Sequence, residues 1–176
     1  MENFKHPTYI VMDLPDQVKR KVMMVREEHH DTFRMALPVE ITLVGSSGAG
    51  VISSGQDEET VFRIIDEIAK QTKPMTLSFK GVERFPGSDF FVLKLSDETN
   101  VRALHEQFLK SGIAFDETKH AFNPHCTLRT KSPISDEEVE KIMKVTISEP
   151  FIVDTLSVYT LEKLPIIKIH TTKLIG

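Results

Sequence analysis

Hydrophobic and polar positions alternate along several short stretches of the chain, which is the pattern of half-buried β-strands. In residues 75–79, Met75, Leu77 and Phe79 share one face and polar side chains occupy the other. The strands expected from such alternation, or from short apolar runs, cover residues 9–14, 40–44, 75–79, 91–95, 125–129, 151–161 and 166–174. Pro86-Gly87 lies between two of them and favours an antiparallel hairpin.

Apolar residues recur at helical spacing in the segments between these strands. Helices are expected over residues 16–30, 57–70 and 98–111, and from 136 onward. Ser135 and Glu138 fit a capping box at the start of the last helix. Helices and strands alternate irregularly, and neither a linker nor a low-complexity segment divides them. The pattern therefore favours an α+β fold over a doubly wound parallel sheet.

Two of the expected strands share a sequence frame that indicates an internal repeat. Each follows a helix, is preceded by a proline and carries the frame X-x-Thr-Leu, in which X is Glu40 in the first and His125 in the second. Alternate side chains of an extended strand share a face. Glu40 is thus expected to line up with Thr42, and His125 with Thr127 and Arg129.

The second of these strands carries the sharper candidate site. An imidazole, a hydroxyl and a guanidinium in a row suit a phosphate group, because they supply a proton donor or acceptor, a hydrogen-bond donor and a bidentate cation. The segment 119–131 is basic and contains no acid, so Arg129 is expected to be the main anchor for an anionic ligand. Taken alone, the same pattern also fits a surface strand whose polar residues face water.

Composition narrows the classes of protein. Hydrophobic residues make up 40% and charged residues 27% of 176 residues, which predicts a single domain over 1–176. The net charge of −4 argues against non-specific nucleic-acid binding, so any contact with RNA would need a local basic site. With one cysteine, no apolar leader and no run long enough to span a bilayer, the chain is expected to be cytoplasmic, without a membrane partner.

Three other features are weaker indications of function. The segment 45–50, Gly-Ser-Ser-Gly-Ala-Gly, imitates a phosphate-binding P-loop, but Val51 and Ile52 stand where that loop needs lysine and Ser/Thr. It is expected to be a mobile loop beside the site, with backbone N–H groups that could touch a ligand. The histidines show no metal-ligand spacing, so we expect neither a metal nor another cofactor. Cys126 points away from His125 on the same strand, which argues against a Cys–His nucleophile.

The chain resembles the two-histidine (2H) phosphoesterases, which include the 2'-5' RNA ligase-like proteins and cyclic nucleotide phosphodiesterases. Residues 122–128, Phe-Asn-Pro-His-Cys-Thr-Leu, are similar to the second His-x-Thr-x motif of that superfamily. Residues 37–45, Leu-Pro-Val-Glu-Ile-Thr-Leu-Val-Gly, are similar to the first, with Glu40 where the family has histidine. The likeness extends to the opening strand that ends in Leu14-Pro15, the Phe85-Pro86 turn, the Leu104-His105 helix and the strand-rich tail.

The resemblance implies a bilobed α+β fold with pseudo-twofold symmetry, antiparallel sheets and the two motifs facing each other across a central cleft. In such enzymes the two histidines act as acid and base on a 2',3'-cyclic or 2'-5' phosphodiester, and the threonines hold phosphate oxygens. His125, Thr127 and Thr42 match this pattern, whereas Glu40 departs from it. A carboxylate can serve as general base beside a histidine acid. However, an unperturbed glutamate has a pKa of about 4.3, and its charge would repel a phosphate by roughly 1–4 kcal/mol.

Two functions follow from the resemblance. The first is a phosphoesterase, a hydrolase or ligase that acts on a 2',3'-cyclic or 2'-5' phosphodiester of RNA or a small nucleotide. In that case Glu40, Thr42, His125 and Thr127 are the catalytic residues and Arg129 binds the substrate. The second is a catalytically inactive domain that binds a nucleotide, an RNA end or a protein partner. In either case the chain is expected to act as a monomer.

Overall fold

Antiparallel sheets form the framework of the chain. The computed structural model describes residues 3–176. Its strands are β1 (Thr8–Asp13), β2 (Glu40–Val44), β3 (Met75–Leu77), β4 (Phe79–Arg84), β5 (Phe91–Leu95), β6 (His125–Arg129), β7 (Phe151–Val153), β8 (Thr155–Thr160) and β9 (Ile167–Lys173). Its helices are α1 (Asp16–Glu28), α2 (Thr32–Met35), α3 (Glu58–Gln71), α4 (Thr99–Leu109) and α5 (Asp136–Met143). The strands pair in the orders β2-β1-β8-β9, β4-β5-β6 and β3-β7, and every pairing is antiparallel.

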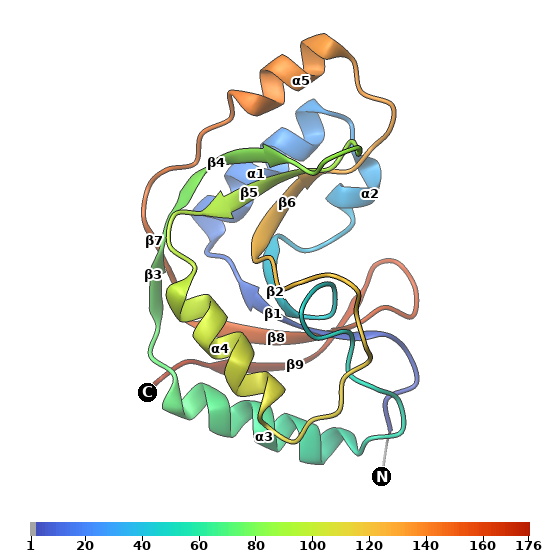
Figure 1. Cartoon of the computed structure of the whole chain (residues 1–176), viewed down its shortest axis with the longest axis vertical. Helices are drawn as coiled ribbons and strands as arrows, with labels where there is room; N and C mark the ends of the chain where they lie inside the picture. The colour runs from blue at the N-terminus through green and yellow to red at the C-terminus, as the bar shows by residue number, and fades with distance from the viewer. Residues whose placement is uncertain (1–2) are drawn as a thin grey trace.

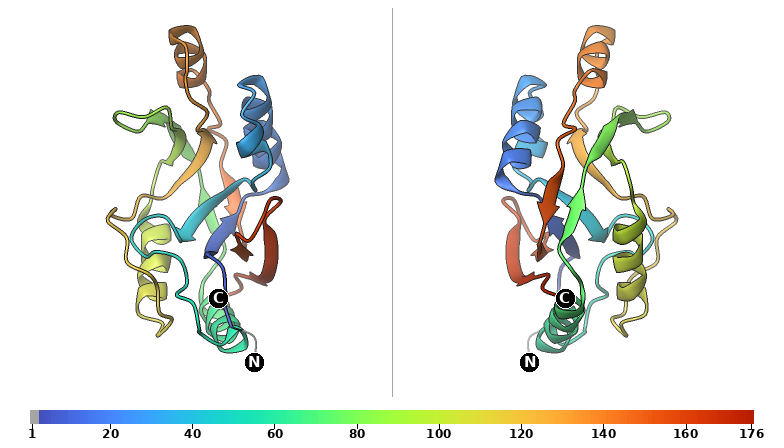
Figure 2. Two further views of the ribbon diagram at one scale, coloured as in Figure 1. Left: turned by 90° about the vertical axis from the view of Figure 1, so that its right-hand side faces the viewer. Right: turned by 90° about the vertical axis from the view of Figure 1, so that its left-hand side faces the viewer.

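The two larger sheets belong to two lobes, and helices cross from one lobe to the other (Figure 1). Helix α1 follows β1 of the first sheet but packs against β6 of the second. Helix α4 follows β5 of the second sheet but packs against β2 of the first. In the side views of Figure 2, α1 and α5 stand at one end of the molecule and α3 lies at the other. This reciprocal exchange confirms the bilobed, pseudo-twofold α+β fold with antiparallel sheets.

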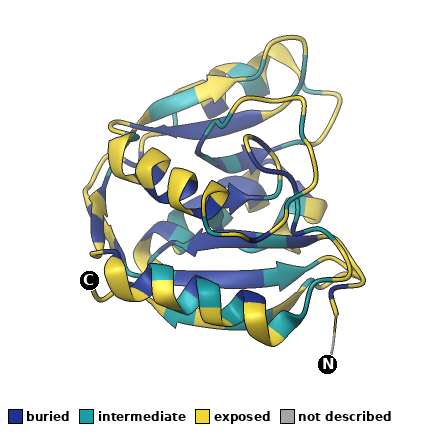
Figure 3. Cartoon of the chain, turned by 60° about the horizontal axis from the view of Figure 1, so that its bottom comes forward, coloured by how far each residue is buried: buried dark blue, intermediate teal, exposed yellow. Residues whose placement is uncertain are grey.

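Strands β2 and β6, here called the motif strands, lie next to each other although they belong to different sheets. They also share one burial pattern. Ile41 and Leu43 of β2, and Cys126 and Leu128 of β6, are buried in the core. The alternate side chains Glu40, Thr42, His125 and Thr127 are only partly buried, and the last residue of each strand is buried again. Figure 3 shows the buried strands enclosed by helices whose outer faces are exposed. The alternation that the sequence predicts is thus confirmed over residues 40–43 and 125–128.

Most of the expected elements are present, and the two motif strands and the Ser135–Glu138 capping box have the positions predicted. The structure differs in three places. The stretch expected to be one strand over 151–161 splits into β7, which pairs with β3, and β8, which pairs with β1. Helix α2 was not predicted, because four residues are too few to show helical periodicity. The stretch expected to be one strand over 75–79 splits between sheets: β3 pairs with β7, and β4 pairs with β5.

Arg26 of α1 ties the two lobes together beneath the motif strands. Its side chain is 1% exposed. Nη1 donates to the carbonyl oxygens of Arg34 at 2.8 Å and Leu37 at 2.9 Å, while Nη2 donates to that of Thr127 at 2.8 Å. The Arg26 guanidinium therefore fixes the segment that leads into β2 relative to β6.

Replacing Arg26 with methionine should lower the free energy of unfolding by about 2–4 kcal/mol, because buried carbonyls in both lobes lose their donors. The matched control is Arg20→Met, on the exposed side of the same helix, which should change stability by less than about 0.5 kcal/mol. Urea denaturation of the two variants measures the difference. Equal midpoints would show that Arg26 does not hold the lobes together.

Candidate active site

A cleft with a volume of about 960 Å³ opens between the lobes, near the upper end of the range typical of small-molecule sites. Glu40 and Thr42 of β2 line it, and so do His125 and Thr127 of β6. The structure thus brings together the four residues that the two sequence frames single out. The rest of the wall comes from β1, α2, the β4–β5 hairpin, the end of β8 with the β8–β9 connection, and residues 37–38, 46–47 and 119–123.

The glycine-rich segment 45–50 lies at the edge of the cleft, where Ser46 and Ser47 line the wall. Its amides are already used: the Gly48 N–H donates to the His120 carbonyl at 2.8 Å, and the Gly50 N–H donates to the Asp116 carbonyl at 2.9 Å. Gly48 has a φ of +70°, and a Cβ there would lie 2.3 Å from Nε2 of His105. The expectation of a mobile loop offering its N–H groups is therefore wrong at these two amides, because the segment 116–120 accepts from them.

His125 is held in one tautomer by the backbone. Its Nδ1 lies 2.6 Å from the carbonyl oxygen of Asn123. Since a carbonyl only accepts, Nδ1 carries the proton, and Nε2 of the neutral ring keeps its lone pair. Burial lowers the pKa of His125, the charges of Lys94 and Arg34 lower it further, and the bond to Asn123 opposes them. At neutral pH the ring is thus mostly neutral and able to accept a proton.

Burial shifts the pKa of Glu40 in the opposite direction from that of His125. Burial raises the pKa of Glu40 to about 7, although the Thr42 hydroxyl, which donates to its carboxylate oxygens at 3.0 and 3.1 Å, and the charges of Arg34 and Arg26 favour the ionised form. A large share of the carboxyl is therefore protonated at neutral pH. In that form it does not repel a phosphodiester, and it can donate a proton.

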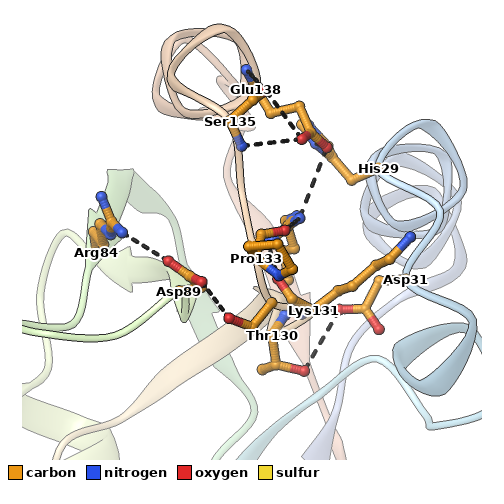
Figure 4. A network of polar contacts seen from close by, with 11 residues as sticks. His29, Asp31, Arg84, Asp89, Thr130, Lys131, Pro133, Ser135 and Glu138 are labelled. Atoms are coloured by element: carbon orange, nitrogen blue, oxygen red, sulfur yellow. Dashed lines mark hydrogen bonds and ion pairs between the residues drawn. The ribbon is translucent and has the colours of Figure 1, made fainter.

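Arg129 lies outside the cleft, contrary to the expectation that it anchors an anionic ligand. Its side chain is 1% exposed and donates to the backbone carbonyls of Lys131 and Pro133, while Nη2 lies 3.7 Å from Glu138. Figure 4 shows Glu138 beside residues 130–135, the loop that connects β6 to α5. The β5–β6 pairing shifts register beside Arg129, and this irregularity breaks the alternation, so position 129 leaves the face of His125.

Arg34 of α2 is the arginine that lines the cleft. Its Nε donates to the Thr130 hydroxyl at 3.1 Å, and its backbone N–H donates to Asp31, which caps α2. Asp31 also accepts from the backbone N–H groups of Thr130 at 2.7 Å and Lys131 at 3.0 Å, as Figure 4 shows in part. Sequence reasoning missed Arg34 because a single helical turn shows no periodicity. The sequence feature that could have indicated Arg34 is its position shortly before the Glu40-x-Thr-Leu strand.

Two further observations concern residues 3–176 alone. No three side chains among their histidines, cysteines and acids gather into a group able to hold a metal ion. None of their helices combines the length and apolar character needed to cross a membrane.

Comparison with known proteins places the chain in a family. The model of the 2'-5' RNA ligase superfamily matches residues 14–164. The chain belongs to this superfamily. A candidate phosphoesterase of Bacillus licheniformis is 31% identical over 84 residues, which cover 47% of this chain and 48% of that relative. The chain thus matches about half the length of this relative.

Solved structures show the same fold. A crystal structure from Thermus thermophilus superposes with a TM-score of 0.66 at 15% identity and covers 97% of this chain and 98% of its own. Escherichia coli LigT without ligand gives a TM-score of 0.61 at 14% identity, with the same coverage. LigT complexed with 3'-AMP gives 0.60 at 16% identity, covering 97% of this chain and 99% of its own. The 2H phosphoesterase fold implied by the sequence resemblance is therefore confirmed.

Replacing Glu40 with glutamine should stabilise the protein at pH 8 by on the order of 2–3 kcal/mol, and much less at pH 5. The unfolded carboxyl titrates near its ordinary value of 4.5, whereas the folded one titrates at about 7. The folded state is thus favoured below pH 4.5, and that advantage is lost as the pH rises through 7. Urea denaturation of Glu40→Gln and wild type at pH 5 and at pH 8 measures the difference in the free energy of unfolding.

The exposed Glu140→Gln variant is the control and should show no pH-dependent gain. A constant difference between Glu40→Gln and wild type from pH 5 to pH 8 would contradict the raised pKa.

Proposed function

We propose that the chain is a 2H-type phosphoesterase acting on a 2',3'-cyclic or 2'-5' phosphodiester of RNA or a small nucleotide, with Glu40 and His125 as its acid–base pair. One observation carries the proposal. The two side chains hold corresponding positions on the two motif strands and line the same cleft. Crystal structures of Escherichia coli LigT with 3'-AMP, ATP and NADP+ support a nucleotide as the ligand.

The protonation states assign a role to each member of the pair. A mostly neutral His125 with a free Nε2 is the base, and protonated Glu40 is the acid, which reverses the base role considered for Glu40 from the sequence. In hydrolysis of a cyclic diester, Nε2 takes a proton from the attacking water as its oxygen bonds to phosphorus. Glu40 gives its proton to the leaving ribose oxygen as that P–O bond breaks. Ligation would use the same transfers in the same direction, with a ribose 5'-hydroxyl attacking the phosphorus of the cyclic diester in place of water.

The remaining polar groups of the cleft suit the phosphate. The Thr127 hydroxyl lies on the face of His125, where it can donate to a phosphate oxygen. The Thr42 hydroxyl, which donates to the ionised Glu40 carboxylate, becomes available to a phosphate oxygen when Glu40 is protonated. Arg34 supplies the positive charge that the sequence analysis assigned to Arg129. Because a guanidinium donates to phosphate in a fixed fork, Arg34 would set the orientation of the diester as well as its affinity.

Turnover of 2',3'-cyclic nucleotides and 2'-5'-linked dinucleotides tests the proposal. Wild type should be active, and His125→Ala and Glu40→Gln should each lower kcat by about 10²–10⁴-fold, because each removes one proton-transfer group. Glu40→His should retain or raise activity, since imidazole also exchanges protons near neutral pH. Glu140→Gln is the matched control and should leave kcat unchanged.

The same assignment fixes the pH dependence of kcat/KM. The rate should rise as His125 loses its proton, below its ordinary pKa, and fall as Glu40 loses its proton at about 7. If wild type and Glu40→His both bind nucleotides but turn over none of these substrates, the chain is an inactive binding domain of the same fold.

Arg34→Ala should weaken binding of 3'-AMP by roughly 1.5–3 kcal/mol, or about ten- to a hundredfold in Kd, the range for a hydrogen bond to a charged group. Arg63→Ala, on the exposed side of α3, is the control and should bind as wild type does. Calorimetric titration gives both constants. An unchanged Kd for Arg34→Ala would assign phosphate recognition to other residues of the cleft.

A further inference from the structure

The residues just before His125 are held by a buried lysine. Lys94 lies on β5 directly opposite His125, and its side chain is 8% exposed. Its Nζ donates to Oδ1 of Asn123 and to the carbonyl oxygen of Pro124 at 3.2 Å. It also lies 2.8 Å from Oε1 of Glu98. Since an ammonium group has three N–H donors, these three partners fix its position.

Glu98, which precedes α4, connects this lysine to a second cation. Its Oε2 accepts from Arg102 Nε at 2.9 Å and from Nη2 at 2.5 Å. Arg102 in turn donates Nη1 to the carbonyl oxygen of Phe122 at 3.1 Å. One carboxylate thus orients two cations that hold the segment 122–124.

This held segment provides the acceptor that sets the tautomer of His125. The Asn123 carbonyl accepts from Nδ1, while the Asn123 N–H donates to the Ser47 hydroxyl at 3.1 Å, in the loop after β2. Asn123 is therefore fixed on one side by the first motif strand's loop and on the other by Lys94. A buried ammonium is unfavourable unless it is fully paired, and the three partners of Lys94 meet that condition. A lysine in this costly position beside the segment 122–124 is explained if it serves to hold that segment.

We propose that Lys94 is a positioning residue for His125: by fixing residues 123–124 it keeps the Asn123 carbonyl on Nδ1 and leaves Nε2 free for proton transfer. The inference rests on the proposed function, in which His125 is the base. It nevertheless concerns a property of the free protein that does not depend on turnover. A neutral histidine side chain in water favours the other tautomer, with the proton on Nε2, so the bias must come from the surrounding structure.

Nitrogen-15 NMR of the protein labelled at histidine tests this, since the shifts of Nδ1 and Nε2 report which nitrogen carries the proton. Wild-type His125, neutral and without ligand, should show the Nδ1–H form. Lys94→Met should convert the signal to a mixture or to the Nε2–H form, because the carbonyl is no longer held. Lys70→Met is the matched control: Lys70 also pairs with a carboxylate, that of Glu67, but on the exposed side of α3, and it should leave His125 unchanged.

Asn123→Ala provides a second variant, which keeps the carbonyl but removes the side chain that Lys94 holds. It should shift the tautomer in the same direction, and it decides the matter if Lys94→Met does not fold. The pKa of His125 is not the readout, because Arg34, Glu83 and Lys94 all act on it and the loss of Lys94 has opposing effects. A folded Lys94→Met, or failing that Asn123→Ala, that retains a pure Nδ1–H form overturns the proposal. Absence of turnover in wild type would instead overturn the proposed function and leave this measurement intact.

Discussion

The contact between β2 and β6 is the constraint on which the site depends. The two strands belong to different sheets, so no ladder of hydrogen bonds joins them, and their spacing is set by what packs around them. Arg26 binds carbonyls on both sides beneath them, and His105 of α4 reaches the Leu43 carbonyl of β2 at 2.7 Å while stacking on Phe122. The cleft is thus a product of inter-lobe packing, and Arg26 and His105, which help to set the spacing of the two strands, do not line it.

The same burial that builds the cleft changes the acid–base behaviour of its residues in opposite directions. Desolvation disfavours the charged form of each group, so it moves the pKa of Glu40 up and that of His125 down. A glutamate whose pKa is about 7 can exchange a proton at neutral pH, which an ordinary glutamate does poorly. A carboxyl at position 40 is therefore compatible with the proposed acid–base chemistry, because burial supplies most of the change in its pKa.

Sequence patterns predicted much of this arrangement. The alternation in residues 40–44 and 125–129 identified Glu40, Thr42, His125 and Thr127, since period-two alternation survives folding in a regular strand. It failed at Arg129, where irregular pairing ends the alternation, and at Arg34, which a single capped turn carries into the cleft. The pKa of Glu40 was also beyond reach, because desolvation depends on lobes that only the folded chain brings together.

The exchange of α1 and α4 between the lobes has a consequence for how the molecule folds. Each sheet is covered in part by a helix that follows a strand of the other sheet, so each lobe packs against a segment that belongs to the other. The contacts that close each core join segments far apart in sequence, which favours slow and concerted folding over independent formation of the two halves. We therefore expect the two lobes to unfold together in one cooperative transition.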